Sequence, residues 1–264
     1  MYDNFCKYLI ETYPDDFATW LIGRSVPLTR LEPTELISEP IRADALLLQG
    51  QGVVLHVEFQ TQPDAQIPER MAQYYLRIRK KFAEQRIVQV VVYLRATASP
   101  LVKQTVFRSG GMTHRFRVIR LWEQPKAVFW NTPGLLPLAI LSQAANQNAA
   151  VLLEQIRVRI SEVTADVGMQ GNLETATAIF AGLKLELAVI KRIMRSQVMR
   201  ESVFYQDIVQ ESEQRGIRKG YLKLLRQLVP FLQGFNVPVE PLLKRLGVTQ
   251  AELDAAKELD DQSS

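Results

Sequence analysis

The stretch VVLHVEFQ, residues 53–60, has the two-residue alternation of a β-strand with two different faces. Its odd-numbered positions are all apolar, whereas its even-numbered positions include His56, Glu58 and Gln60. Successive side chains of a strand point to opposite faces, so these three polar side chains share one face. The stretch therefore predicts a strand with apolar groups on one side and polar atoms on the other.

A second apolar-rich run, residues 41–48, precedes this strand, and Gln49-Gly50-Gln51-Gly52 separates the two. Two such runs joined by a glycine-rich connection predict a β-hairpin. After the hairpin, Pro68 stands where the first turn of a helix tolerates proline, and apolar residues recur at helical spacing as far as Phe82. We therefore expect a helix to follow the second strand.

Further strands are predicted after this helix. The run IVQVVVYL, residues 87–94, is almost entirely apolar and β-branched, which is typical of a strand covered on both faces. Residues 113–122 predict another strand, on which Arg115 and Arg117 share one face. At the start of the chain, apolar positions in residues 3–22 predict one or two short helices that cover the sheet.

The order of these elements predicts an α/β domain over residues 1–134, with a mixed sheet flanked by helices. Beyond it, long helical patterns replace the strand signals, so we expect residues 135–264 to form a mostly helical C-terminal region. The predicted helices of that region span residues 148–164, 173–200, 202–228 and 239–258.

The composition is that of a folded globular chain. Of 264 residues, 47% are hydrophobic and 23% are charged, which excludes a fibre or a disordered chain for most of the sequence. No apolar run approaches the length of about 18 residues that a membrane span needs, and no signal sequence opens the chain, so we expect a cytoplasmic protein. The single cysteine, Cys6, and two distant histidines, His56 and His114, exclude structural zinc and thiol redox chemistry.

Positive charge is concentrated in the middle of the chain. Residues 1–66 contain 4 Lys and Arg against 10 Asp and Glu, residues 67–120 contain 12 against 2, and residues 121–264 contain 16 of each. A net charge of +10 in the central stretch suits a phosphate-binding surface, because counterion release supplies most non-specific affinity for nucleic acid. A solvated basic surface without a ligand is the alternative that charge alone leaves open.

Asp44 and Glu58 are candidate metal ligands on the two strands of the predicted hairpin. Mg²⁺ is usually held by one or two carboxylates together with water and phosphate oxygens. Directly opposite residues of an antiparallel pair share a face, so the two carboxylates converge if a loop over residues 49–53 places Asp44 opposite Glu58. We predict this odd-length connection, with the Gln60 amide beside the carboxylates, where it orients water or contacts phosphate.

Three stretches, RADALLL (42–48), HVEFQ (56–60) and RMAQY (70–74), together resemble a known family. The combination is similar to the recombination-promoting nucleases of the PD-(D/E)XK superfamily, a bacterial group also described as transposases. The resemblance covers most of the chain, because it extends through the run IVQVVVYL and through RVIRLWE (117–123), PGLLPL (133–138) and VFYQDI (203–208).

The resemblance implies a restriction-endonuclease-like fold and a hydrolase that cuts DNA with Mg²⁺, or with Mn²⁺ as an alternative, in recombination or transposition. Carried over by position, Asp44 and Glu58 are catalytic metal ligands, with Glu39 as an additional acidic ligand. Gln60, the third catalytic residue, stands where the superfamily usually has lysine. Glutamine lacks the positive charge of lysine, so this departure predicts weaker turnover.

The helix after the hairpin supplies the expected DNA contacts. Its polar positions include Arg70, Gln73, Arg77, Lys80 and Lys81. We expect these side chains to bind phosphates. For Arg70 and Gln73, bracing the site is a second possible role, and a place on a solvated helix face without function is the alternative. Lys80 and Lys81 are the candidates to replace the lysine that Gln60 lacks.

Two alternatives belong to other classes of protein. The missing lysine favours a DNA-binding protein that has weak or no catalysis, and the long C-terminal helices favour a helical interaction protein that self-associates. Without the resemblance, Asp44 and Glu58 are ordinary solvent-facing strand residues. For a nuclease we expect a homodimer, because two chains with one site each most simply make a double-strand cut.

Overall fold

The structure, a computed structural model of the chain, describes residues 2–30 and 45–194, together with Val229, Lys244 and Thr249. The chain divides into two compact units, residues 1–203 and 204–264. All helices and strands given below belong to the first unit. That unit extends well past residue 134, where the sequence predicted a domain boundary.

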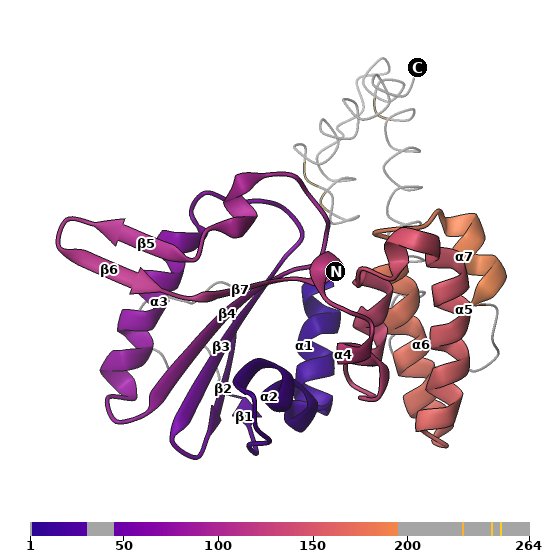
Figure 1. Cartoon of the computed structure of the whole chain (residues 1–264), viewed down its shortest axis with the longest axis horizontal. Coiled ribbons are helices and arrows are strands. Elements are labelled where there is room, and N and C mark those ends of the chain that lie inside the picture. The colour runs from indigo at the N-terminus through magenta and orange to yellow at the C-terminus, as the bar shows by residue number, and fades with distance from the viewer. Residues whose placement is uncertain (1, 31–44, 195–228, 230–243, 245–248, 250–264) are drawn as a thin grey trace. The chain divides into compact units, whose positions relative to one another are not determined.

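A five-stranded mixed sheet with the strand order β1-β2-β3-β4-β7 lies at the centre of the first unit (Figure 1). The strands β1, β2 and β3 are antiparallel neighbours, whereas β3, β4 and β7 run parallel. This arrangement confirms the predicted α/β class with a mixed sheet flanked by helices. The strands are β1 (Thr29–Arg30), β2 (Ala45–Gly50), β3 (Val53–Gln60), β4 (Arg86–Tyr93) and β7 (Arg117–Arg120).

The two central strands, β3 and β4, are covered on both faces. They pair in register along their whole length, from Val53 opposite Arg86 to Gln60 opposite Tyr93. Every residue of β3 except the last is buried, and so are the last six residues of β4. The strand predicted at 87–94 is therefore confirmed as a doubly covered strand, within one residue at each end.

The helix α3 (Ile67–Lys81) connects β3 to β4 and covers one face of the sheet (Figure 1). Pro68 stands in its first turn, where the missing N–H has no partner within the helix, and three basic residues in the last turn suit the negative end of the helix dipole. Met71 packs against β4, and Ile78 packs against Val54 of β3. Burial of each such side chain contributes about 1.5–3 kcal/mol to folding.

Two short helices, α1 (Tyr2–Thr12) and α2 (Pro14–Ile22), cover the opposite face of the sheet, as the sequence predicted (Figure 1). The break between them comes directly before Pro14, because proline interrupts the interior of a helix but is tolerated in its first turn. From the sheet, the guanidinium of Arg117 donates a hydrogen bond to the carbonyl of Leu21. This bond ties α2 to β7.

The predicted register of the β2–β3 hairpin is wrong. The strands are joined by a two-residue turn, Gln51-Gly52, and Glu58 lies opposite Ala45 rather than opposite Asp44. Gly52 has φ +69°, the left-handed conformation that two-residue hairpin turns require and that glycine adopts without strain. A five-residue loop over residues 49–53 is therefore not formed, and Asp44 itself lies outside the described residues.

The strand predicted over 113–122 is also wrong, because two strands replace it. β5 (Val106–Ser109) and β6 (Met112–Arg115) form a separate hairpin, and β7 begins only after Phe116. The N–H of Phe116 donates to the carbonyl of Thr105 at 3.0 Å, and its ring packs into the cluster under α3. This break places Arg115 and Arg117 in different sheets.

The helical part after residue 121 agrees with the prediction only in part. The helix predicted at 148–164 corresponds to α5, but the helix predicted at 173–200 is interrupted, because α6 ends at Ala181 and α7 begins at Leu187. Those predicted at 202–228 and 239–258 lie outside the described residues, except Lys244 and Thr249. The bounds are η2 (Pro100–Lys103), η3 (Leu121–Glu123), α4 (Ala127–Trp130), η4 (Leu136–Leu141), α5 (Ala145–Val163), α6 (Val167–Ala181) and α7 (Leu187–Ile193).

These helices share a core with the N-terminal pair. The side chain of Asn172 donates to the hydroxyl of Tyr8 at 3.1 Å, and the rings of Tyr2 and Phe180 stack with centroids 6.5 Å apart. Within the part of the chain that the structure describes, no helix combines the length and the apolar character of a membrane span.

A substitution at Gly134 tests whether the segment after α4 packs against the N-terminal helices. Its N–H donates to a carboxylate oxygen of Asp16 at 2.8 Å, and an added methyl group would overlap the side chain of Tyr13. We expect Gly134→Ala to destabilise the protein by about 1–3 kcal/mol in urea unfolding, because overpacking forces neighbours apart. The control is Gly111→Ala, where a methyl group meets no atom within 4 Å, and which should change stability by less than about 0.5 kcal/mol. Equal effects of the two changes would contradict this packing.

Candidate active site

Polar side chains gather at the carboxyl ends of the two central parallel strands. Gln60 ends β3 and Tyr93 ends β4, and these two residues are register partners. Glu58 lies one step back on the same face of β3, opposite Val91. In sheets with parallel strands, ligands bind in the crevice outside the carboxyl ends, so this edge is where a site is expected.

A buried ion pair connects this edge to α3. The Nε of Arg70 lies 2.7 Å from Oε1 of Glu58, whose side chain has 0% exposure, and the Arg70 side chain is only 9% exposed. The other edge of the guanidinium, Nη1, lies 3.0 Å from Oδ2 of Asp64, which is 32% exposed. Gln60 donates from its Nε2 to the same Glu58 oxygen at 3.2 Å. Burial of the carboxylate is therefore offset by a cation and an amide donor.

Tyr93 lies against this cluster as a neutral phenol. Its burial, together with the negative charges of Asp64 and Glu58, raises its pKa to about 12, although Arg70 acts in the opposite direction. At neutral pH the hydroxyl keeps its proton. It is a potential hydrogen-bond donor beside the two carboxylates.

The edge continues to a second arginine. Arg120 ends β7 and is the register partner of Tyr93, so Gln60, Tyr93 and Arg120 form a row across three parallel strands. Its Nη2 lies 2.8 Å from Glu123, and this hydrogen-bonded pair raises the pKa of Arg120 and lowers the pKa of Glu123. The Arg120 side chain is 23% exposed, which leaves it accessible at the edge.

Beside the ion pair, a buried network joins three elements through Gln89 of β4. Gln89 donates from Nε2 to the carbonyl of Met71 at 3.0 Å, and since a carbonyl only accepts, this bond orients the amide. The same nitrogen then donates to Nδ1 of His56 at 2.9 Å, and the Gln89 oxygen accepts from Nε2 of His114 at 2.7 Å. Both imidazole rings are therefore held in defined tautomers.

Both histidines are neutral in the folded protein. Burial lowers the pKa of His56 to about 3, with smaller contributions from the positive charges of Arg70 and His114. Burial also lowers the pKa of His114. His56 lies edge-on to the Tyr74 ring, with centroids 5.1 Å apart, so it is a packed core residue rather than one that faces solvent.

The structure brings together Glu58, Gln60 and Arg70 among the predicted site residues. Asp44 and Glu39 lie outside the described residues. Of the roles considered for Arg70, its burial and its contacts with Glu58 and Asp64 fit bracing, and they fit neither a phosphate contact nor a solvated helix face.

The remaining predicted DNA contacts lie on α3 at increasing distance from Glu58. Gln73 is exposed and donates to Glu69 at 3.3 Å. Lys80 and Lys81 are exposed in the last turn, ten or more residues after Arg70, which is about 15 Å along the axis at the rise of an α-helix. This separation argues against these two lysines replacing the lysine that Gln60 lacks.

Sequence reasoning missed Asp64, Tyr93 and Arg120. Asp64 lies in the short connection between β3 and α3, and the other two end parallel strands. The sequence did contain a signal for them, because residues at or just after the carboxyl ends of parallel strands meet at one edge of the sheet. For Arg120 this signal could be used only if the break at Phe116 was known, since otherwise Arg120 is not recognised as the end of a strand.

The described residues at this edge supply one buried carboxylate, Glu58, for a hard cation such as Mg²⁺. No group of three acidic, histidine or cysteine side chains suited to a metal is present among the described residues. Mg²⁺ needs only one or two carboxylates when water and phosphate oxygens complete its shell. Glu58 supplies one carboxylate at this edge. Asp44, which the sequence proposes as the second, lies outside the described part of the chain, and the register predicted to bring it opposite Glu58 is not formed.

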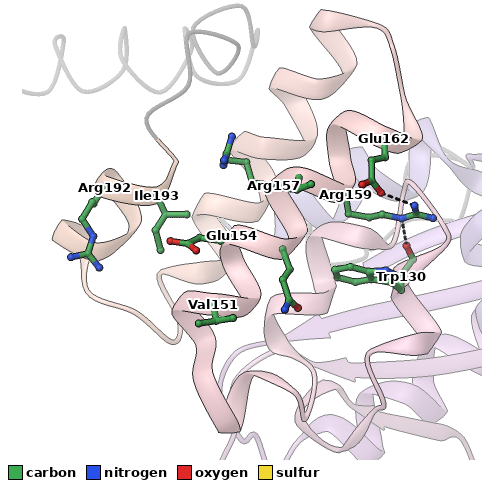
Figure 2. Close-up of a pocket in the computed structure, with 10 residues that line it drawn as sticks. Trp130, Val151, Glu154, Arg157, Arg159, Glu162, Arg192 and Ile193 are labelled. Atoms are coloured by element: carbon green, nitrogen blue, oxygen red, sulfur yellow. Dashed lines mark hydrogen bonds and ion pairs between the residues drawn. The ribbon is translucent and has the colours of Figure 1, made fainter.

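A separate cavity of about 620 Å³ lies among α4, α5 and α7 (Figure 2). On its wall, Arg159 pairs with Glu162 at 2.8 Å and donates from Nε to the carbonyl of Trp130 at 3.4 Å (Figure 2). None of the predicted site residues that the structure describes lines it. The cavity therefore adds nothing to the chemistry of the sheet edge.

Comparison with known proteins identifies no relative: no family model, curated protein or solved structure matches the chain. The interpretation of the site consequently depends on its residues and their geometry.

The neutral histidines make stability depend on pH. A histidine with a lowered folded pKa binds its proton mainly in the unfolded chain, so its contribution is complete above about pH 6.5 and is lost as the pH falls toward about 3. For His56 the expected loss of unfolding free energy between pH 8 and pH 5 is about 2 kcal/mol. Urea unfolding at both pH values measures it. His56→Gln should show a correspondingly smaller loss, and an equal loss in both proteins would contradict a neutral, buried His56.

Proposed function

We propose that this protein is a Mg²⁺-dependent DNA endonuclease of the restriction-endonuclease-like type, linked to recombination or transposition. The observation that carries the proposal is the position of Glu58 and Gln60 at the carboxyl edge of β3, beside a buried arginine from the crossover helix. The order of β3 and α3 supports it, because the E-x-Q motif is followed by a helix that carries Arg70 and Tyr74, as in the pattern on which the resemblance to PD-(D/E)XK nucleases is based.

Glu58 is the described residue that would hold the metal. Asp44 and Glu39 are ligands proposed from the resemblance alone, because the hairpin register that would have placed Asp44 opposite Glu58 is not formed. When bound, Mg²⁺ or Mn²⁺ would lower the pKa of an attacking water and neutralise charge on the scissile phosphate. The chain itself orients the Glu58 carboxylate through Gln60 and Arg70. Gln60 thus acts on the carboxylate rather than supplying the positive charge that lysine would.

Positive charge for the DNA backbone is available elsewhere in the proposed site. Arg120 is partly exposed at the end of the row across the parallel strands, and Lys80 and Lys81 are exposed farther along α3. These residues belong to the central stretch of net charge +10. Phosphate contacts spread over such a surface would hold DNA without reading its sequence.

A second candidate function is DNA binding without cleavage. Two observations favour it: Glu58 has 0% exposure, and the Gln60 amide is already bonded to Glu58. In this function the buried ion pair would only stabilise the fold, and the basic surface would bind DNA in a salt-dependent manner.

Cleavage of supercoiled plasmid by the purified full chain distinguishes these functions. We expect wild type to nick or linearise DNA with Mg²⁺ and not with EDTA, and Glu58→Ala and Asp44→Ala to lower the rate by at least about 100-fold. Glu69→Ala is the matched control, since it also removes a carboxylate from this region but from the exposed first turn of α3.

Cleavage that persists at the wild-type rate in both Glu58→Ala and Asp44→Ala would contradict the proposed site. No cleavage by wild type, with DNA retarded on a gel at low salt, would instead establish the second candidate. Light scattering on the same preparations reports whether the active species is the expected homodimer.

A further inference from the structure

Arg70 has the contacts of a residue that orients Glu58. Its guanidinium is held at two edges, by Glu58 at Nε and by Asp64 at Nη1. Asp64 is fixed in turn, because its other oxygen, Oδ1, accepts from the N–H of Gln66 at 2.8 Å. A chain of hydrogen bonds and ion pairs therefore runs from the start of α3 through Asp64 and Arg70 to Glu58.

Two contacts to Glu58 converge on a single oxygen. Oε1 forms an ion pair with Arg70 Nε at 2.7 Å and accepts a hydrogen bond from Gln60 Nε2 at 3.2 Å, and these partners come from α3 and from β3 itself. An ion pair and a hydrogen bond from different elements at one oxygen restrict the rotation of the carboxylate. They therefore also restrict the direction in which the second oxygen, Oε2, points.

The environment of Arg70 holds it in this position. Its neighbours in the helix, Ile67 and Met71, pack into the core cluster with Val91 and Tyr93. The Arg70 side chain is 9% exposed, so few rotamers are open to it. Lysine has no fork of N–H groups and could not contact Asp64 and Glu58 in the same way.

We propose that Arg70 is a positioning residue for the candidate metal ligand Glu58, and that Asp64 is the anchor that holds Arg70 in place. This inference rests on the proposed nuclease function. Partners of this kind orient a metal ligand without touching the metal, and their loss typically lowers metal affinity or activity by about 10-fold to 100-fold.

The experiment measures plasmid cleavage by the full chain as a function of Mg²⁺ concentration. Arg70→Ala should lower the rate by about 10-fold to 100-fold and raise the Mg²⁺ concentration for half-maximal rate. Millimolar guanidinium chloride should restore part of the rate, whereas sodium chloride at the same concentration should not. Arg70→Lys should remain impaired, and Asp64→Asn should change the Mg²⁺ dependence in the same direction but less.

Two controls separate positioning from a general structural role. Arg79→Ala removes an exposed arginine from the last turn of the same helix and should leave the Mg²⁺ dependence unchanged. Glu58→Ala should not respond to guanidinium, because the group to be oriented is absent. An Arg70→Ala protein with wild-type Mg²⁺ dependence, or one whose lost rate guanidinium does not restore, would overturn the inference.

Failure of the proposed function has a different signature. If wild type does not cleave, the Tm values of Glu58→Gln, Arg70→Ala and the double variant still test whether Arg70 and Glu58 interact. We expect the double variant to lose less Tm than the two single losses combined, because each single change leaves a buried charge without its partner. Additive losses of Tm would show that Arg70 and Glu58 are not coupled, and would overturn the inference that Arg70 positions Glu58.

Discussion

The contact between Glu58 and Arg70 is the interaction on which the rest of the site depends. A carboxylate with no exposed surface has lost the water that would stabilise its charge, and only a close cation and hydrogen bonds offset that loss. Because the cation comes from α3, the electrostatics of β3 and the placement of the crossover helix are coupled. A shift of one residue along α3 would rotate Arg70 by about 100° and leave Glu58 without its partner.

The polar face of β3 is unusual because it lies inside the protein. His56 is bonded to Gln89, Glu58 to Arg70, and Gln60 to Glu58, so each polar side chain finds a partner on its own strand, on β4 or on α3. Apolar residues of similar volume would often be as stable as such a buried pair. Stability alone therefore does not account for these residues, and the position of this charged cluster at the carboxyl edge of parallel strands is the basis of the proposed site.

The sequence predicted the elements better than it predicted their relations. The strands β3 and β4 and the helix α3 follow from strong periodicity, which local sequence controls. The prediction of the hairpin register was wrong because the register depends on the conformation of one residue, Gly52, whose positive φ permits a two-residue turn. The break at Phe116 was missed because tertiary packing of its ring decides it.

In the candidate site, too, local features could be predicted from the sequence and tertiary contacts could not. Glu58 and Gln60 were recognised from an alternating strand and a motif, which are local features. The anchoring role of Asp64 and the buried position of Arg70 depend on how α3 lies against β3, which no single stretch of sequence encodes. Diffraction from crystals of the full chain grown with Mn²⁺ would show whether Glu58 binds a metal, since the anomalous signal locates Mn²⁺. We expect Mn²⁺ at the carboxyl edge of β3 with a Glu58 oxygen in its coordination shell and the Arg70 contact retained. Mn²⁺ bound only elsewhere, with Glu58 contacting protein groups alone, would contradict it.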